Sequence, residues 1–177
     1  MSDPDDIATS TFGIEESISS ASVPHTSITN TSNVYGGYVS FYIDVDNLQV
    51  TELIFSGGLP SPVTVYDISN EFSNSINADV PLGLHFAPPV QKMYVMNRSG
   101  KVFQYRITND GIGDFNDSIN STVLEGSIQL NGISNATSGP GAFELSMSKN
   151  GKKLYVFDKG SEEIKQFELS SAYEITT

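Results

Sequence analysis

A stretch of strand, turn and strand that occurs three times constrains this chain most. The stretches are "LIFSGGLPSPVTVYDIS" from Leu53, "MYVMNRSGKVFQYRIT" from Met93 and "LYVFDKGSEEIKQFELS" from Leu154. Apolar and polar residues alternate in each half, and glycine, proline or charged residues separate the halves. We expect Tyr66, Tyr105 and Phe167 to be equivalent aromatic residues. A repeated unit of this kind indicates a repeat architecture, because one unit alone cannot bury its apolar face.

An apolar strand precedes each of the two later stretches, at residues 82–86 and 143–147, and "VLEGSIQL" is a candidate fourth strand. Units of three or four antiparallel strands at this spacing are typical of β-propeller blades. The sequence therefore predicts an all-β fold of propeller-like blades in an incomplete ring. We expect about three units, at residues 35–79, 80–122 and 123–177.

Residues 1–34 differ from the rest, because they contain 13 serine or threonine residues and several acids without a sustained apolar period. This composition predicts an extended N-terminal arm. From Tyr35 the chain alternates apolar and polar residues. We expect Val39, Phe41, Ile43 and Val45 to form a buried face, and "DVDN" at residues 44–47 to form a hairpin turn.

The net charge of −12 is placed unevenly, because residues 1–91 contain 11 acids and no lysine or arginine. Such an acidic half repels phosphate backbones, so we expect no nucleic acid partner. The acidic surface has two interpretations, solubility or contact with a basic partner. No apolar window is long enough to span a membrane, and "MSDPDDIATSTF" lacks the pattern of a signal peptide.

Catalytic motifs are not found in the sequence. There is no cysteine, the histidines are His25 and His85, and no nucleophile elbow, P-loop or zinc motif occurs. His85 in "GLHFAPP" is interpreted as a partly buried strand residue rather than a catalytic base. We therefore expect no catalytic residues and no cofactor.

Two groups of residues are candidates for binding. "NDGIGDFND" brings Asp110, Asp114, Asn116 and Asp117 together, and carboxylate and amide oxygens on a tight loop suit Ca²⁺. The alternative is an acidic surface turn, which Asp-Gly favours by itself. Three tyrosines near the start of the first unit are candidates for an exposed interaction surface: Tyr35, Tyr38 and Tyr42.

The segment "NGKKLYVFDKGSEEIKQFEL" resembles the YVTN-like β-propeller repeats, and it is similar to repeats in virion proteins of marine bacteriophages. The resemblance is best at residues 143–177, fair at 82–120 and weak at 39–79. It implies blades of a ring that needs about four to eight of them, so copies of this chain, a partner or a longer chain would supply the rest. The family has enzymatic relatives among sugar-lactone hydrolases, whose sites draw side chains from many blades.

These observations lead to a functional prediction. We expect a structural or binding protein that is not an enzyme, located in a virion as a capsid decoration, tail or fibre subunit. It would assemble with itself or with a protein partner, with no membrane contact. One alternative is a surface or secreted recognition module that binds glycan or protein, and another is a lactonase-like hydrolase.

Overall fold

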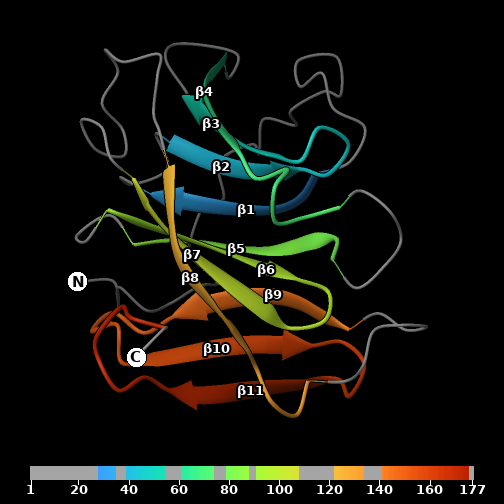
Figure 1. Cartoon of the computed structure of the whole chain (residues 1–177), viewed down its shortest axis with the longest axis vertical. Coiled ribbons are helices and arrows are strands. Elements are labelled where there is room, and N and C mark those ends of the chain that lie inside the picture. Colours follow the sequence, from blue (N-terminus) through green and yellow to red (C-terminus); the bar gives the residue numbers. More distant parts are fainter. Residues whose placement is uncertain are drawn as a thin grey trace, which may run out of the picture.

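The computed structural model describes residues 28–34, 39–54, 61–73, 79–87, 91–107, 122–133 and 141–175. This part contains three antiparallel sheets and no helix (Figure 1). The first sheet is β1 (Ile28–Val34), β2 (Val39–Asp44), β3 (Gln49–Ile54) and β4 (Ser61–Asp67). The second is β5 (Pro81–Ala87), β6 (Lys92–Asn97), β7 (Lys101–Ile107) and β8 (Thr122–Gln129). The third is β9 (Ala142–Met147), β10 (Lys153–Asp158) and β11 (Glu163–Glu168). The predicted all-β fold is confirmed.

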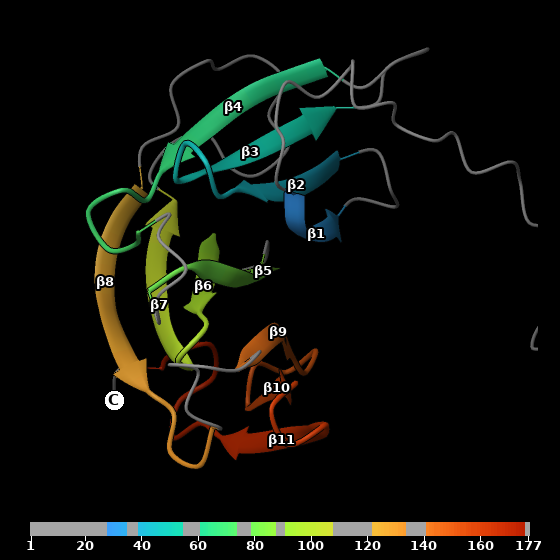
Figure 2. The same ribbon diagram turned by 90° about the vertical axis from the view of Figure 1, so that its right-hand side faces the viewer.

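The three sheets follow one another as propeller blades do. Strand β5 contacts both β1 and β9, so the first strands of the sheets form the inner side of the arrangement. Figure 2 shows β1, β5 and β9 one below the other, with β4, β8 and β11 at the far ends of their sheets. The sheets do not close into a ring, which confirms the predicted incomplete ring. We call the face that a sheet turns toward the following sheet its forward face.

The order of the strands corrects the alignment of the first unit. Since β1 is the inner strand of the first sheet, β2 corresponds to β6 and β10, and β3 corresponds to β7 and β11. The alignment of the three repeated stretches had instead placed residues 53–55 opposite the residues of β6, and Tyr66 opposite Tyr105. Tyr66 lies on the fourth strand β4, so it is not the counterpart of Tyr105. The first sheet begins within the segment that was predicted as an arm, because β1 pairs with β2.

The corrected equivalence explains the turns after the second strands. Asp44, Asn97 and Asp158 end β2, β6 and β10, and each is at most 1% exposed. Asp44 Oδ1 accepts the backbone N–H groups of residues 46 and 47, and Asn97 Oδ1 accepts that of Lys101. Short polar side chains that accept backbone N–H groups favour tight turns. The predicted hairpin turn at residues 44–47 is confirmed.

A residue with positive φ ends each of these turns, immediately before the next strand. The angles are 53° at Leu48, 81° at Gly100 and 57° at Glu162. Glycine adopts this conformation without steric cost, whereas leucine and glutamate are strained in it. A Cβ atom at position 100 would also lie 2.7 Å from Ile133 Cγ1, so the second turn requires glycine for two reasons.

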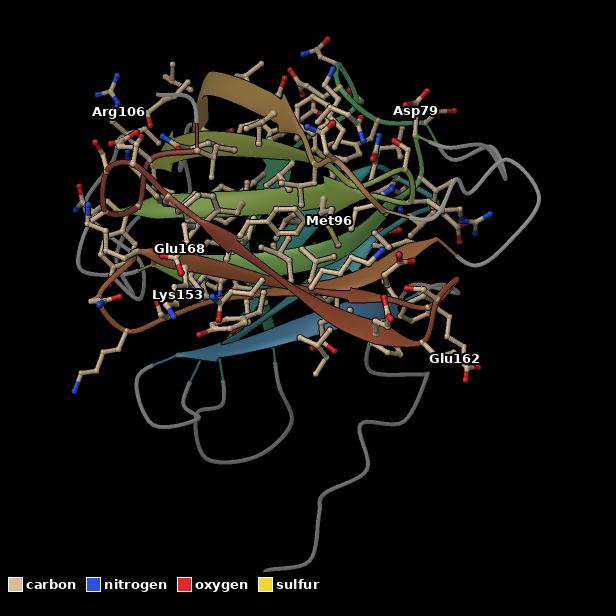
Figure 3. The ribbon with its side chains drawn as sticks, turned by 90° about the horizontal axis from the view of Figure 1, so that it is seen from below. Asp79, Met96, Arg106, Lys153, Glu162 and Glu168 are labelled. Carbon is tan, nitrogen blue, oxygen red and sulfur yellow. The ribbon has the colours of Figure 1, made fainter. Side chains whose placement is uncertain are left out.

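The apolar core lies between the sheets. Met93 and Val95 of β6 face the first sheet, and Tyr94 and Met96 between them face the third, so the second sheet is buried on both faces. Phe41 of β2 stacks on Phe86 of β5 with the ring centroids 3.7 Å apart. Figure 3 shows Met96 inside the stack of sheets. Such burial on both faces fixes the spacing of neighbouring sheets.

The prediction of a buried face on β2 is confirmed for its described residues. Phe41, Ile43 and Val45 are at most 8% exposed. Tyr42, expected on an exposed surface, and Asp44 on the same face of the strand are also buried, at 1% and 0%. Alternation therefore located the core of the first sheet but not the burial of its other face.

The buried acid of the third turn allows a stability test. Asp158 accepts hydrogen bonds from Gly160 N at 3.1 Å and Ser161 Oγ at 3.0 Å, and Lys165 Nζ lies 2.7 Å from Oδ2. We expect Asp158→Ala to lower the free energy of unfolding by about 2 kcal/mol, because it leaves these donors without their acceptor. Urea denaturation measures the change.

The control is Asp158→Asn, since the residue of the second sheet that corresponds to Asp158 is Asn97. It keeps the Oδ1 acceptor for Gly160 N and replaces the oxygen that accepts from Ser161 and Lys165, so we expect a smaller cost of roughly 1 kcal/mol. Equal effects of the two variants would contradict the role of the turn hydrogen bonds.

Candidate functional site

Residues 169–175, which we call the closing segment, follow β11 and fold back against the third sheet. Tyr173 N donates to Gly151 O at 2.8 Å, and Tyr173 Oη donates to Lys149 O at 2.5 Å. A Cβ atom at position 151 would lie 2.4 Å from Tyr173 Cδ2, and Gly151 has a φ of 66°. Only glycine lets the tyrosine ring lie this close to the turn. The closing segment is thus held in a defined place.

The same segment is bound by two side chains of the second sheet. Tyr94 Oη donates to Tyr173 O at 2.8 Å. Gln104 Oε1 accepts Ile175 N at 3.0 Å, and Gln104 Nε2 donates to Glu174 at 2.8 Å. Gln104 is fully buried and faces Tyr94 across the β6–β7 pair. These two forward-face side chains bind the backbone of the next blade.

A charged cluster lies beside these bonds. Lys92 is 8% exposed, forms an ion pair with Glu174, and lies 3.2 Å from Glu125. Arg106 Nε also lies 3.2 Å from Glu125. Burial alone would raise the pKa of Glu174, but hydrogen bonds from Lys92 and Gln104 hold it below its ordinary value. The cluster therefore keeps its charges paired where the second and third blades meet.

The forward face of the third sheet differs, because no described residue covers it. Its side chains come from all three strands: Glu144, Ser146, Tyr155, Phe157, Ile164 and Gln166. Ile164 is 74% exposed. Most of these side chains line a shallow hollow of about 150 Å³. This hollow offers both apolar and polar side chains to a ligand or partner.

His85 lies on the inner strand β5, as the sequence predicted. It is half-buried, and its ring centroid lies 6.2 Å from that of Tyr94. Burial lowers the pKa of His85 to about 4. The imidazole is therefore neutral near pH 7 and can accept a hydrogen bond, whereas burial disfavours its protonated form.

The structure places only part of the predicted binding residues. Asp110, Asp114, Asn116 and Asp117 lie outside the described residues, as do Tyr35 and Tyr38. Tyr42 is described and 1% exposed, so its ring is not part of an exposed surface. Within the described residues, no three histidine, aspartate or glutamate side chains lie close enough to hold a metal ion, and no helix could span a membrane.

Tyr94 and Gln104 were not selected from the sequence. The signal that could have found them is the recurrence of both at matching places, as Tyr155 and Gln166 in the third sheet. Lys92, Glu125 and Glu174 come from β6, β8 and the closing segment, and no local spacing connects them. Only the packing of the third blade on the second brings those charges together.

Comparison with solved structures supports the propeller-like arrangement. The chain is similar to a candidate 6-phosphogluconolactonase from Bacteroides fragilis, with a TM-score of 0.51 and 16% identity over 80% of this chain and 34% of that one. It is also similar to one from Bacteroides uniformis, with a TM-score of 0.51 and 18% identity over 81% and 37%. The chain thus spans about a third of these proteins. No known family model matches the sequence, and no curated protein matches it significantly.

These neighbours correct the functional prediction. The expectation of a virion component without enzymatic activity is wrong, because the similar solved structures are candidate 6-phosphogluconolactonases. The resemblance rested on the amino-acid sequence of the repeated strands and turns. That sequence reflects blade packing and turn chemistry, which unrelated propellers share. At this level of identity the likeness shows a propeller-type fold, and the YVTN-like and bacteriophage parts of the resemblance have no support in it.

The buried glutamine and its exposed counterpart provide a matched pair of variants. We expect Gln104→Ala to lower the free energy of unfolding by about 3 kcal/mol, because it leaves the closing segment and two carboxylates without their partner. Gln166→Ala, at the corresponding exposed position, should change it by less than about 0.5 kcal/mol. Urea denaturation of both variants measures these changes. Similar losses of unfolding free energy in the two variants would contradict the binding role of Gln104.

The lowered pKa of His85 predicts a dependence of stability on pH. The unfolded chain has the ordinary pKa of 6.5 and the folded chain a pKa of about 4, so unfolding takes up a proton between these values. The contribution is complete above pH 6.5 and falls by roughly 3 kcal/mol as the pH drops to 4. His85→Gln should remove this slope in denaturation curves measured between pH 7 and 4. An unchanged slope in the variant would show that other groups cause it.

Proposed function

We propose that the chain supplies three consecutive blades of a lactone-hydrolysing propeller. The observation that carries the proposal is the common arrangement of the three sheets with two candidate 6-phosphogluconolactonases over 80% and 81% of the chain. The strand–turn–strand repeat that the second and third units share supports the assignment of those units as blades. The substrate class is a lactone of a sugar acid, and the phosphorylated lactone named for the neighbours is the first candidate.

Hydrolysis of a lactone adds water across the ring ester. The carbon–oxygen ring bond breaks, and a carboxylic acid and a hydroxyl group form. Such a site needs a group that accepts a proton from water and donors for the developing oxyanion. The blades that the structure describes offer His85, Glu144 and Ser146 from the inner strands β5 and β9.

The roles proposed for these residues follow from their surroundings. Burial keeps His85 neutral near pH 7 and disfavours its protonated form, so the imidazole can orient a water molecule through a hydrogen bond, whereas Glu144 is an exposed carboxylate that can accept a proton. Ser146 has the same place opposite Tyr155 as His85 has opposite Tyr94. The lysine and arginine next to the closing segment are paired with carboxylates, so the donors for a phosphate group would come from outside this cluster.

The proposal predicts measurable turnover. We expect the purified chain to open 6-phosphogluconolactone or gluconolactone faster than the spontaneous reaction, measured as acid release at constant pH. His85→Gln should lower kcat/KM at least about tenfold, because it removes the imidazole that orients the attacking water, and misplacement of a reacting group costs factors of this size or more. Ile128→Ala on β8 is the control, since that side chain is 38% exposed and distant in the fold from β5.

Release at the spontaneous rate with both lactones would contradict the proposed activity. Equal turnover by the chain and by His85→Gln would contradict the role of His85 and leave the reaction itself supported.

A further inference from the structure

The chain contains two asparagines that are each followed by a glycine, Asn131 before Gly132 and Asn150 before Gly151. Such a pair can react with itself, because the backbone nitrogen of the glycine can attack the side-chain amide carbon of the asparagine. Glycine favours the attack, since it has no Cβ atom that blocks the approach and it adopts conformations that other residues avoid. The two pairs share this chemistry, so their surroundings determine which of them reacts.

The pair at residues 150 and 151 is held by hydrogen bonds on both of its reacting groups. Asn150 Oδ1 accepts Ser148 Oγ at 2.8 Å and Lys152 N at 3.1 Å, so the side chain is fixed. Gly151 N donates to Ser148 O at 2.8 Å. The ring of Tyr173 also lies against Gly151, which is buried. An attack would have to break these bonds and move the closing segment, so the fold protects this pair.

The pair at residues 131 and 132 has none of these constraints. It follows β8 at the start of the connection to β9, and both of its residues are exposed. In the described part of the chain, neither the Asn131 side chain nor Gly132 N takes part in a hydrogen bond. Gly132 has a φ of 78°, and a Cβ atom at this position would have no atom within 4 Å. The attacking nitrogen and the amide carbon are therefore free to approach each other.

We propose that Asn131 is a site of spontaneous deamidation through a cyclic imide. Gly132 N forms a bond to Asn131 Cγ, the bond from Cγ to the side-chain nitrogen breaks, and ammonia leaves with the proton of Gly132 N. Water then opens the imide. Cleavage between Cγ and the ring nitrogen gives aspartate, whereas cleavage at the main-chain carbonyl gives isoaspartate, in which the chain runs through the side chain. Water is the only co-reactant, and the inference does not depend on lactone hydrolysis.

The modified residue lies beside a contact that connects the linker between the second and third blades to the third blade. Lys165 Nζ donates to Gly132 O and also lies 2.7 Å from Oδ2 of the fully buried Asp158. Isoaspartate adds a carbon atom to the main chain directly before Gly132, and it adds a carboxylate there. Both changes act on the carbonyl that Lys165 binds, so the reaction alters the junction between the two blades.

Ageing of the folded chain in mildly alkaline buffer tests the proposal, with the second pair as an internal control. Cleavage after glutamate separates the two pairs, because Asn131 lies between Glu125 and Glu144, and Asn150 between Glu144 and Glu162. Mass spectrometry of the fragments measures the conversion of amide to acid, and their fragmentation identifies isoaspartate. We expect residue 131 to convert at least about tenfold faster than residue 150, because several hydrogen bonds must open before residue 150 reacts.

Further measurements separate the effect of the fold from that of the local sequence. In urea, where the hydrogen bonds of the turn are lost, the two pairs should convert at similar rates. In the folded chain, Ser148→Ala should speed the conversion of residue 150, because it removes one hydrogen bond to Asn150 Oδ1, and it should leave residue 131 unaffected. Asn131→Gln should show no conversion at position 131, since the longer side chain does not form the five-membered ring.

Three results would overturn the proposal. The first is no detectable conversion of residue 131 in the folded chain, and the second is conversion of both pairs at equal rates there. The third is a difference between the pairs that persists unchanged in urea, because the local sequence and not the fold would then cause it.

Discussion

Burial of both faces of the second sheet is the constraint on which the rest of the structure depends. Its strands alternate side chains between two apolar cores, so Met93 and Val95 pack against the first sheet and Tyr94 and Met96 against the third. A sheet buried in this way cannot be stable without neighbours on both sides. The inner strands β1, β5 and β9 therefore lie side by side, and the blades succeed one another in chain order.

Such packing also buries polar groups, which must find partners. At the turns, all three sheets use the same arrangement: the buried side chains of Asp44, Asn97 and Asp158 accept backbone N–H groups. Between blades, Gln104 binds both the backbone and the carboxylate of the closing segment. A buried amide with its hydrogen bonds made fixes the register of the two blades, whereas apolar packing alone would tolerate sliding.

Alternation and turn chemistry predicted most of the strands and the hairpin at residues 44–47, because these signals are local. They also indicated a strand at "VLEGSIQL", but the predicted units placed it in the third unit, whereas β8 belongs to the second sheet. They failed for the first unit, where similar apolar runs matched β3 and β4 to the wrong strands. The inner strand that would have corrected the match, "ITNTSNV", is polar and was interpreted as part of an arm. The cluster of Lys92, Glu125 and Glu174 could not be predicted, since those charges meet only after two blades pack.

The function could not be predicted from the amino-acid sequence of the repeat, because the repeated residues are determined by packing. Residues such as Leu154 and Val156 recur because they pack against the neighbouring blade, so they report on the fold and not on chemistry. Chemistry in a propeller depends on the side chains that inner strands from several blades present together. Of those strands, the structure describes the side chains of β5 and β9, which provide His85, Glu144 and Ser146.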